Sequence, residues 1–405
     1  MKRTILSLVA ISLMLTLWNS CKEDIDDPDK WVPTPYEFEV PQRFPTILNI
    51  PEDNPLTVEG VELGRYLFYD GRMSGRTDSL MSCATCHRQS RAFDIGTDHP
   101  DYPGGFPHGL TGIPTPHVTL PLFNLVWNHN GYLWNGMIHK SNTNLGSAGY
   151  GIPAEPQYHM RNIESLVWMG IAAPHEIIGS VQKTVDLIAS IEMYPPMFEK
   201  AFGTPEVTYD RISKAIAQFI RTIVSANSYA HKVFRGEANF NDSERRGYVL
   251  FVTEEGADCF HCHGSEGAPL FTTNLFYNNA KDTCFTGVCQ DPRDRYAITG
   301  NEMDRGAYKA TTLINIEHQG PYMHDGRFAT LDEVIDFYNM GLKHSKYAHP
   351  LMHKVYPPYS HGMMLNPSQL NDLKNFLLTL TDNEFLTNPK YSNPKPGDSY
   401  FIDNN

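Results

Sequence analysis

The sequence predicts a mainly α-helical protein made of two domains, and three observations support this fold class. The chain has 405 residues, which is enough for two compact cores. Apolar residues recur at helical spacing in several segments, whereas little of the chain alternates in the way of a strand. The pentapeptide C-x-x-C-H occurs once in each half, at Cys83–His87 and at Cys259–His263. We therefore expect each half to be built around one copy of this motif.

Residues 1–21 are typical of an export signal. A basic start leads into an apolar stretch that ends at Trp18, shorter than the roughly 20 residues that span a membrane. The stretch meets Cys21, and an acidic, Pro-rich tether follows over residues 22–45. This order resembles a bacterial lipoprotein signal, with a lipid anchor on Cys21 and a periplasmic or cell-envelope location. An ordinary cleaved signal peptide, in which Cys21 is incidental, is the alternative, and both interpretations predict export.

The predicted N-terminal domain covers residues 46–235. Its first helical pattern, over residues 59–68, places Leu63 and Leu67 on one face. Gly- and Pro-rich composition predicts a long irregular loop over residues 96–117 and an insertion over residues 139–160. From about Val181 helical patterns dominate, in the segments 185–202 and 209–228.

The predicted C-terminal domain covers residues 236–405. Asp242 is the expected N-cap of the helix that opens it. A later helix is expected from about Leu331, capped by Thr330 with Glu333 at the capping-box position. Residues 366–382 predict a final amphipathic helix.

Four interpretations compete for the repeated C-x-x-C-H motif: a dithiol switch, a zinc site, chance, and covalent attachment of haem c. A histidine follows the second cysteine both times, which a dithiol switch does not require. The wide separation of the two copies suits two domains better than one zinc site. We therefore predict two cytochrome c-like helical domains, each with one covalently bound haem c. The attachment residues are Cys83, Cys86, Cys259 and Cys262, and the proximal iron ligands are His87 and His263.

Two further cysteines, Cys284 and Cys289, have four residues between them in a loop that contains Gly and Asp. In an oxidising compartment we expect a local disulfide between them, and two free thiols are the alternative. The formal net charge of −13 argues against a nucleic-acid partner and is compatible with a basic protein partner.

Met323 is the expected sixth ligand of the second haem iron. Gly320-Pro321 precedes it and Asp325-Gly326 follows it, which predicts a short loop that could direct the sulfur at the iron. A thioether ligand favours ferrous iron and raises its potential, whereas an open sixth position lets a substrate bind. The other methionines are better explained as core residues.

The chain resembles the bacterial diheme cytochrome c peroxidases and the related diheme enzymes of methylamine utilisation. The resemblance runs from about residue 54 to about residue 382. It is carried, in order, by LGRYLFYDGRMS, SCATCHRQSRAF, PLFNLVW, PHEIIG, ERRGYVLF, CFHCHG and GPYMHDGRFATLDEVIDFYNMG. It implies that the N-terminal haem, on His87, is the peroxide site. It also implies that electrons enter at the C-terminal haem, on His263 and Met323.

The resemblance also implies roles for individual residues. Glu176 matches the distal glutamate, which can move a proton during peroxide cleavage; a solvated loop carboxylate is the alternative. Trp134 matches the aromatic residue between the haems; a buried core tryptophan is the alternative. His108 is the best candidate for a loop histidine that ligates the first iron, and His99 and His117 are weaker candidates.

This sequence departs from the family pattern at several positions. Residues 133–137 read L-W-N-G-M instead of F-W-D-G-R, and His117-Val118 replaces an Arg-Asn pair. Leu166 stands where a distal Gln is expected. The lost Asn weakens the expectation of a calcium ion between the domains. Met323 argues against the methylamine-utilisation type, which has Tyr on its second haem, but the adjacent Tyr322 leaves this distinction open.

The leading hypothesis is an exported diheme peroxidase that reduces hydrogen peroxide to water. Its electrons would come from a small redox protein, a cytochrome c or a cupredoxin. One alternative is a diheme oxidase or oxygenating enzyme that acts on another substrate, such as a protein side chain. The other is a plain electron carrier in which both irons are closed. A homodimer is an expectation from the family alone.

Overall fold

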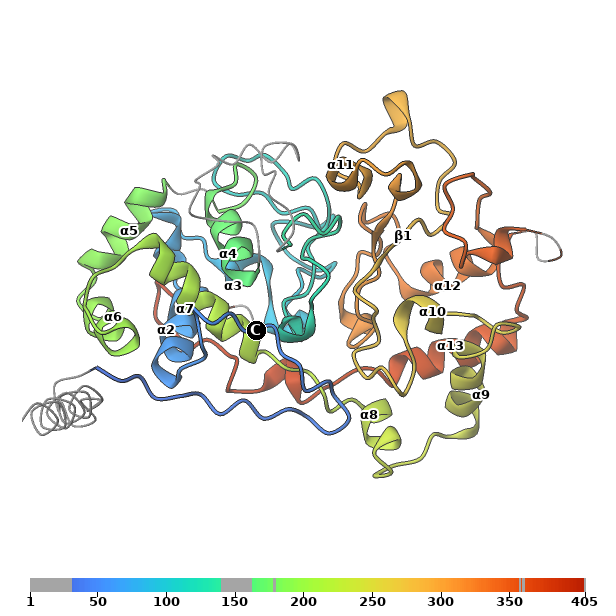
Figure 1. Cartoon of the computed structure of the whole chain (residues 1–405), viewed down its shortest axis with the longest axis horizontal. Coiled ribbons are helices and arrows are strands. Elements are labelled where there is room, and N and C mark those ends of the chain that lie inside the picture. Colours follow the sequence, from blue (N-terminus) through green and yellow to red (C-terminus); the bar gives the residue numbers. More distant parts are fainter. Residues whose placement is uncertain (1–30, 140–161, 178–179, 357, 359–360, 404–405) are drawn as a thin grey trace, which may run out of the picture. The chain divides into compact units, whose positions relative to one another are not determined.

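The structure is a computed structural model that describes residues 31–139, 162–177, 180–356, 358 and 361–403 (Figure 1). Residues 34–405 form one compact, mainly helical unit, so the predicted helical class is confirmed. The predicted signal and anchor residue, and nearly all of the insertion at 139–160, lie outside the described residues. Among the described helices, none has the length and apolar character that crossing a membrane requires.

The helices of the first half pack around α2 and α7. Thr57 caps α2 by accepting a hydrogen bond from the Gly60 amide at 3.0 Å, and Leu63 and Leu67 are fully buried, as the pattern predicted. The helix α2 packs against α7 and α6, and α4 packs against α7. The bounds are α2 (Val58–Tyr69), α4 (Ile163–Ala172), α5 (Val181–Ser190), α6 (Tyr194–Phe202) and α7 (Tyr209–Thr222).

The helices of the second half pack around α9 and α13, with α12 alongside α13. The predicted cap of α12 is confirmed, because Thr330 and Glu333 form a reciprocal capping box. The bounds are α8 (Tyr229–Phe234), α9 (Asp242–Phe251), α11 (Tyr296–Thr299), α12 (Leu331–Met340) and α13 (Pro367–Leu378). Phe251, Phe271 and Phe376 are fully buried in the same continuous core as Leu63, which joins the two halves.

The prediction that Asp242 caps α9 was wrong by one residue. Asn241 is the N-cap: its side chain accepts from the Glu244 amide at 3.0 Å, and the Glu244 carboxylate accepts from the Asn241 amide at 2.9 Å. This reciprocal pair needs Glu or Gln three residues after the cap, a condition that Asn241 meets. Asp242 has Arg245 at that position, so it cannot form the box.

After α13 the chain returns to the first half. The Gln89 side chain donates to the carbonyl of Phe385 at 3.1 Å, and the Tyr69 hydroxyl donates to the carbonyl of Tyr391 at 2.7 Å. The amide of Ile402 donates to the carbonyl of Tyr69 at 2.8 Å. The predicted division at residue 235 did not anticipate that the last segment returns to Tyr69, at the end of α2.

A two-stranded antiparallel sheet lies where the halves meet. It pairs β1 (Phe276–Tyr277) with β2 (Tyr308–Lys309). The amide of Lys309 also donates to the carbonyl of Trp134, from the first half, at 2.8 Å. The connection between β1 and β2 carries the disulfide between Cys284 and Cys289, which confirms the predicted pairing.

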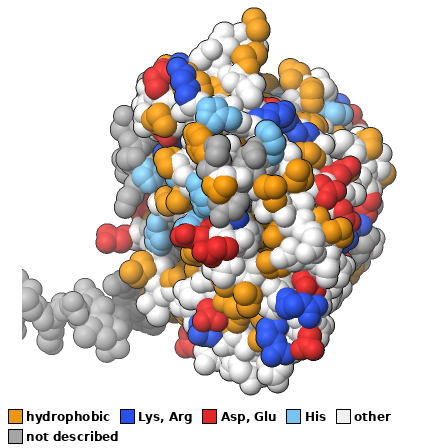
Figure 2. Space-filling view, turned by 90° about the vertical axis from the view of Figure 1, so that its right-hand side faces the viewer, with side chains coloured by type: hydrophobic (Ala, Val, Ile, Leu, Met, Phe, Trp, Pro, Cys, Tyr) orange, Lys and Arg blue, Asp and Glu red, His pale blue; other side chains and the backbone are white. Residues whose placement is uncertain are grey.

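The described part of residues 96–117 contains no helix or strand, as the composition predicted. Figure 2 shows one face of the molecule, on which acidic and basic side chains are interspersed with apolar ones, and several histidines gather together. The net charge of −13 is therefore not displayed on this face as a single acidic patch.

We predict that Gly64→Ala destabilises the protein, although alanine ordinarily favours a helix by about 1 kcal/mol. A Cβ at Gly64 would lie 1.9 Å from the carbonyl oxygen of Ala215, so α2 and α7 would have to separate, at a cost of about 1–3 kcal/mol. The measurement is urea unfolding followed by circular dichroism. Gly267→Ala is the matched control, because no atom lies within 4 Å of its added Cβ. Equal urea midpoints for Gly64→Ala and Gly267→Ala would contradict the close approach of α2 and α7.

Candidate active site

Both C-x-x-C-H motifs fold into a single helical turn. These turns are α3 (Cys83–Cys86) and α10 (Phe260–His263). In each, the histidine amide donates to the carbonyl of the first cysteine at 3.0 Å, from His87 to Cys83 and from His263 to Cys259. The two thiols and the imidazole of each motif therefore project from one turn of backbone, as covalent haem attachment requires.

The two motifs line separate cavities. Cys83, Cys86 and His87 line the first, and the second motif lines the other. The two cavities have similar volumes, about 190 and 210 Å³. Because the cysteine pairs face different cavities, they do not form one four-cysteine zinc site. The arrangement fits one haem for each motif.

The motif thiols are poorly suited to redox exchange. Burial, followed by the charge of Glu176, raises the pKa of Cys83 to about 12. Burial likewise raises the pKa of Cys259 to about 12. A dithiol switch depends on a lowered thiol pKa, so the structure disfavours that interpretation.

The two histidines are held as iron ligands should be. Nδ1 of His87 donates to the carbonyl of Phe93 at 2.9 Å, and Nδ1 of His263 donates to the carbonyl of Thr311 at 3.1 Å. A carbonyl can only accept, so the proton sits on Nδ1 and Nε2 keeps its lone pair. Burial lowers the pKa of both histidines to about 4, which keeps the imidazoles neutral and able to coordinate.

Glu176 lies in the wall of the first cavity. Burial raises its pKa to about 7, so the carboxyl changes charge near neutral pH. Gly109 packs directly on the backbone of Glu176, since a Cβ there would clash with the Glu176 carbonyl. Leu166, at the position where a Gln was expected, lines the same cavity. The apolar lining also includes Leu122, Phe123, Val167, Met169, Ile177 and Ile220.

The structure separates the three candidate loop histidines. Both ring nitrogens of His99 are engaged, Nε2 with the carbonyl of Thr85 and Nδ1 with the amide of Asp101. Nε2 of His117 bonds Asp291 at 2.7 Å. His108 is exposed at the edge of the first cavity, with Nδ1 bonded to the carbonyl of Gly109. His108 is thus the best placed of the three, and its role as a ligand stays a prediction.

Met323 lies in the wall of the second cavity, in a loop as predicted. Its sulfur lies 3.4 Å from Nδ2 of Asn279, which also bonds the hydroxyl of Tyr338. The hydroxyl of Tyr322 donates to the carbonyl of Ile316 at 2.9 Å. The Tyr322 oxygen is therefore already engaged, which favours Met323 as the sixth ligand.

Three residues line both cavities and form their shared wall: Trp134, Lys309 and Thr311. Nε1 of Trp134 donates to the carbonyl of Val118 at 2.9 Å, which fixes the indole. Thr311 supplies the carbonyl that orients His263. Trp134 thus lies in the wall between the two cavities, and its role between two haems stays a prediction.

Sequence analysis missed Lys309, because a single lysine in a short polar stretch is usually exposed. Here it is only 8% exposed. Its ammonium donates to the carbonyl of Asn274 at 3.2 Å and lies 4.5 Å from the centre of the Phe276 ring. Burial, followed by the charge of Arg295, lowers the pKa of Lys309 to about 7. The calcium ion that the resemblance implies between the halves stays a prediction.

Comparisons with known proteins place these features in context. The family model for di-haem cytochrome c peroxidase matches residues 58–239. The methylamine utilization protein MauG of Methylorubrum extorquens is 30% identical over 301 residues, covering 74% of each chain. The cytochrome c551 peroxidase of Nitrosomonas europaea is 32% identical over 286 residues, covering 70% of this chain and 73% of that one.

Solved structures share the fold. A MauG-like protein associated with microbial copper homeostasis superposes with a TM-score of 0.72 at 29% identity, covering 89% of this chain and 99% of that one. The diheme peroxidase BthA of Burkholderia thailandensis superposes with a TM-score of 0.62 at 18% identity, covering 82% of this chain and 88% of that one. The second likeness shows the fold alone.

We predict that Lys309→Met changes how the free energy of unfolding depends on pH. The pKa of Lys309 is lower in the folded protein than its usual 10.5, so the unfolded chain binds more protons from pH 7 to 10. Wild-type stability should therefore gain from this group as pH rises through that window. The free energy of unfolding of the variant should exceed that of wild type by more than about 1 kcal/mol at pH 6, and the difference should be smaller at pH 9. Urea unfolding at both pH values measures this.

Lys183→Met, at an exposed position on α5, is the matched control, and its difference from wild type should not vary with pH. A Lys309→Met difference that is equally constant would contradict the lowered pKa.

We predict that Met323→Ala lowers the reduction potential of the second haem by on the order of 100 mV, because a thioether ligand stabilises ferrous iron. Spectroelectrochemical titration measures both potentials. Met340→Ala, at a side chain that is 58% exposed, should leave them unchanged. An unchanged potential in Met323→Ala would direct attention to Met352 and Met363, which line the same cavity.

Proposed function

The chain belongs to the di-haem cytochrome c peroxidase family, and we propose that it reduces hydrogen peroxide to water with electrons from a small redox protein. The single observation that carries this proposal is the asymmetry of two cavities that share one wall. Each has a motif for covalent haem and an oriented histidine, but the ionisable Glu176 lies only in the first, and Met323 only in the second. Haem c, once attached, supplies the redox-active iron.

In the first cavity Glu176 is the proton-transfer residue. Its pKa near 7 lets the carboxylate accept a proton and return it at neutral pH. The apolar residues around it exclude water, which strengthens its electrostatic effect on a bound substrate. The carbonyl of Phe93 orients the ring of His87, at the end of the attachment turn, by accepting a hydrogen bond from its Nδ1.

The second cavity receives electrons, and Trp134 provides the route between the cavities. Its indole is part of the shared wall, and hydrogen bonds at Nε1 and at its carbonyl hold it in place. A cytochrome c or a cupredoxin is the proposed donor. The net charge of −13 suits a donor with a basic docking surface.

We propose in addition that the protein is exported and anchored through a lipid on Cys21. Support comes from the basic, apolar and then acidic order of the first residues. The local disulfide between Cys284 and Cys289 is consistent with an oxidising compartment. Homodimerisation is a further proposal and rests on the family alone.

A second candidate function is oxidation of another substrate, such as a protein side chain. Leu166 makes the first cavity more apolar at a position where a Gln was expected. One relative at 30% identity is named as a methylamine utilization protein rather than a peroxidase. Both facts suit a diheme oxidase with a different substrate.

The experiment that tests the proposal is optical and EPR spectroscopy of the purified haem protein, oxidised and half-reduced, followed by steady-state peroxide turnover with a reduced donor. We expect two haem c per chain, a high-spin haem after half-reduction, and turnover. A high-spin haem without peroxide turnover would favour the oxidase. Two low-spin haems that ignore peroxide would indicate a plain electron carrier.

We predict that Glu176→Gln lowers peroxide turnover by about 100-fold or more, because the amide cannot accept a proton. Wild-type turnover should fall as pH decreases through about 7, where the carboxylate becomes protonated, and this dependence should vanish in the variant. Stopped-flow kinetics from pH 5.5 to 8.5 measures both effects. Glu199→Gln, on the exposed surface of α6, is the control and should behave as wild type. Retention of the pH dependence in Glu176→Gln would assign it to another group.

A further inference from the structure

Three side chains with metal-binding atoms meet beside the shared wall. They are His117, Asp291 and His324, from three segments far apart in the sequence, and their ligating atoms all lie within 4.8 Å of one another. In the parts of the chain that the structure describes, no other group of three His, Cys, Asp or Glu residues meets this condition. Nothing in the proposed peroxidase chemistry uses these residues.

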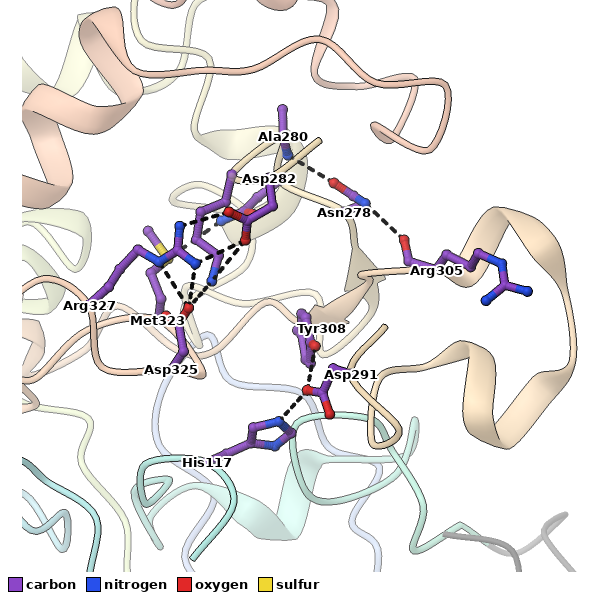
Figure 3. A network of polar contacts seen from close by, with 12 residues as sticks. His117, Asn278, Ala280, Asp282, Asp291, Arg305, Tyr308, Met323, Asp325 and Arg327 are labelled. Carbon is purple, nitrogen blue, oxygen red and sulfur yellow. Dashed lines mark hydrogen bonds and ion pairs between the residues drawn. The ribbon is translucent and has the colours of Figure 1, made fainter. Parts of the chain in front are cut away.

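The cluster is held in place by its neighbours. The Asp291 carboxylate accepts from Nε2 of His117 at 2.7 Å and from the hydroxyl of Tyr308 at 2.7 Å (Figure 3). The ring of His324 stacks on Tyr308 with 3.4 Å between centroids, and lies 5.1 Å from the ring of His117. The amide of Val118 donates to the carbonyl of His324 at 3.0 Å, which ties two of the three segments together. Such prior ordering lowers the entropic cost of binding an ion.

The donor set indicates the class of ion. Two imidazoles and one carboxylate suit zinc or copper(II), whereas calcium and magnesium prefer oxygen ligands alone. Ligand atoms about 2.0–2.1 Å from one tetrahedral ion are roughly 3.3 Å apart. The most widely separated pair, at most 4.8 Å apart, would need to close by at most about 1.5 Å, and the His117–Asp291 pair at 2.7 Å would need to open by about 0.6 Å. The phenol oxygen of Tyr308 or a water would complete the coordination.

The charges around the cluster do not oppose a cation. Lys281 is paired with Asp325 at 2.6 Å, and Arg327 is paired with Asp282 at 3.0 Å, so these four charges balance. Asp291 then contributes one negative charge, and its side chain is only 28% exposed. Asp294 also lines the cavity that holds Asp291 and His324.

We propose that His117, Asp291 and His324 bind a divalent zinc or copper ion, which connects the two halves of the molecule next to the wall between the cavities. His117 also lines the first cavity and His324 also lines the second, so the site lies between them, and binding of the ion does not depend on the peroxidase activity. His117 comes from the loop of the first half, and His324 directly follows Met323 of the second. The ion replaces the proton that His117 shares with Asp291.

The test uses the purified protein with both haems and no affinity tag, stripped with a chelator and then titrated with zinc or copper(II) by calorimetry. Figure 2 shows histidines gathered on one face, so weak surface binding must be separated from the site. His344→Gln is the matched control, because this histidine is exposed and lies outside the cluster. The His344→Gln protein should bind one metal ion per chain as tightly as wild type does.

We expect His117→Gln and Asp291→Asn each to raise the dissociation constant of the tightly bound ion at least about tenfold. Each should also abolish the rise in melting temperature that the ion gives wild type. Copper EPR should show coupling to nitrogen that His117→Gln reduces. Haem content and circular dichroism establish that each variant is folded. If the wild type binds no more tightly than His117→Gln, the three residues form only a hydrogen-bonded network and the proposal is wrong. If His324→Gln disturbs the haem beside Met323, His117→Gln alone decides the question.

Discussion

The two cavities depend on one shared wall, and a few backbone hydrogen bonds of residues 308–311 hold that wall together. β2 pairs with β1 in the second half, while the amide of Lys309 reaches the carbonyl of Trp134 in the first. Two residues later, the carbonyl of Thr311 orients His263. A displacement of this short segment would move His263 in the second cavity and Trp134, which faces both cavities. Backbone geometry therefore couples the two sites directly.

Burial has a different consequence for each ionisable group around this wall. It keeps His87 and His263 neutral, as iron ligation requires. It brings the pKa of Glu176 up to about 7 and that of Lys309 down to about 7, from opposite directions. One physical cause, the cost of placing charge in an apolar surrounding, thus keeps two imidazoles neutral and gives one carboxyl and one ammonium a charge that changes near pH 7.

Local sequence signals predicted local structure well. The face of α2, the disulfide and the cap at Thr330 were all predictable because each depends on residues within a few positions of one another. The cap at Asn241 was missed by one residue, since two adjacent polar residues both suit a cap and only the partner three positions on distinguishes them. The return of the last segment onto α2 was not predicted, because it rests on contacts such as that between Tyr69 and Tyr391.

The sequence by itself determined the two C-x-x-C-H turns and the loop that carries Met323, and it predicted His87 and His263 as iron ligands, because each depends on residues within a few positions of one another. Only the tertiary structure decided which histidines are already engaged, why the Tyr322 hydroxyl points elsewhere, and that Lys309 is buried between the cavities. It also brought His117, Asp291 and His324 together. These results depend on which distant segments pack against each other, and the spacing of residues along a chain carries little information about that.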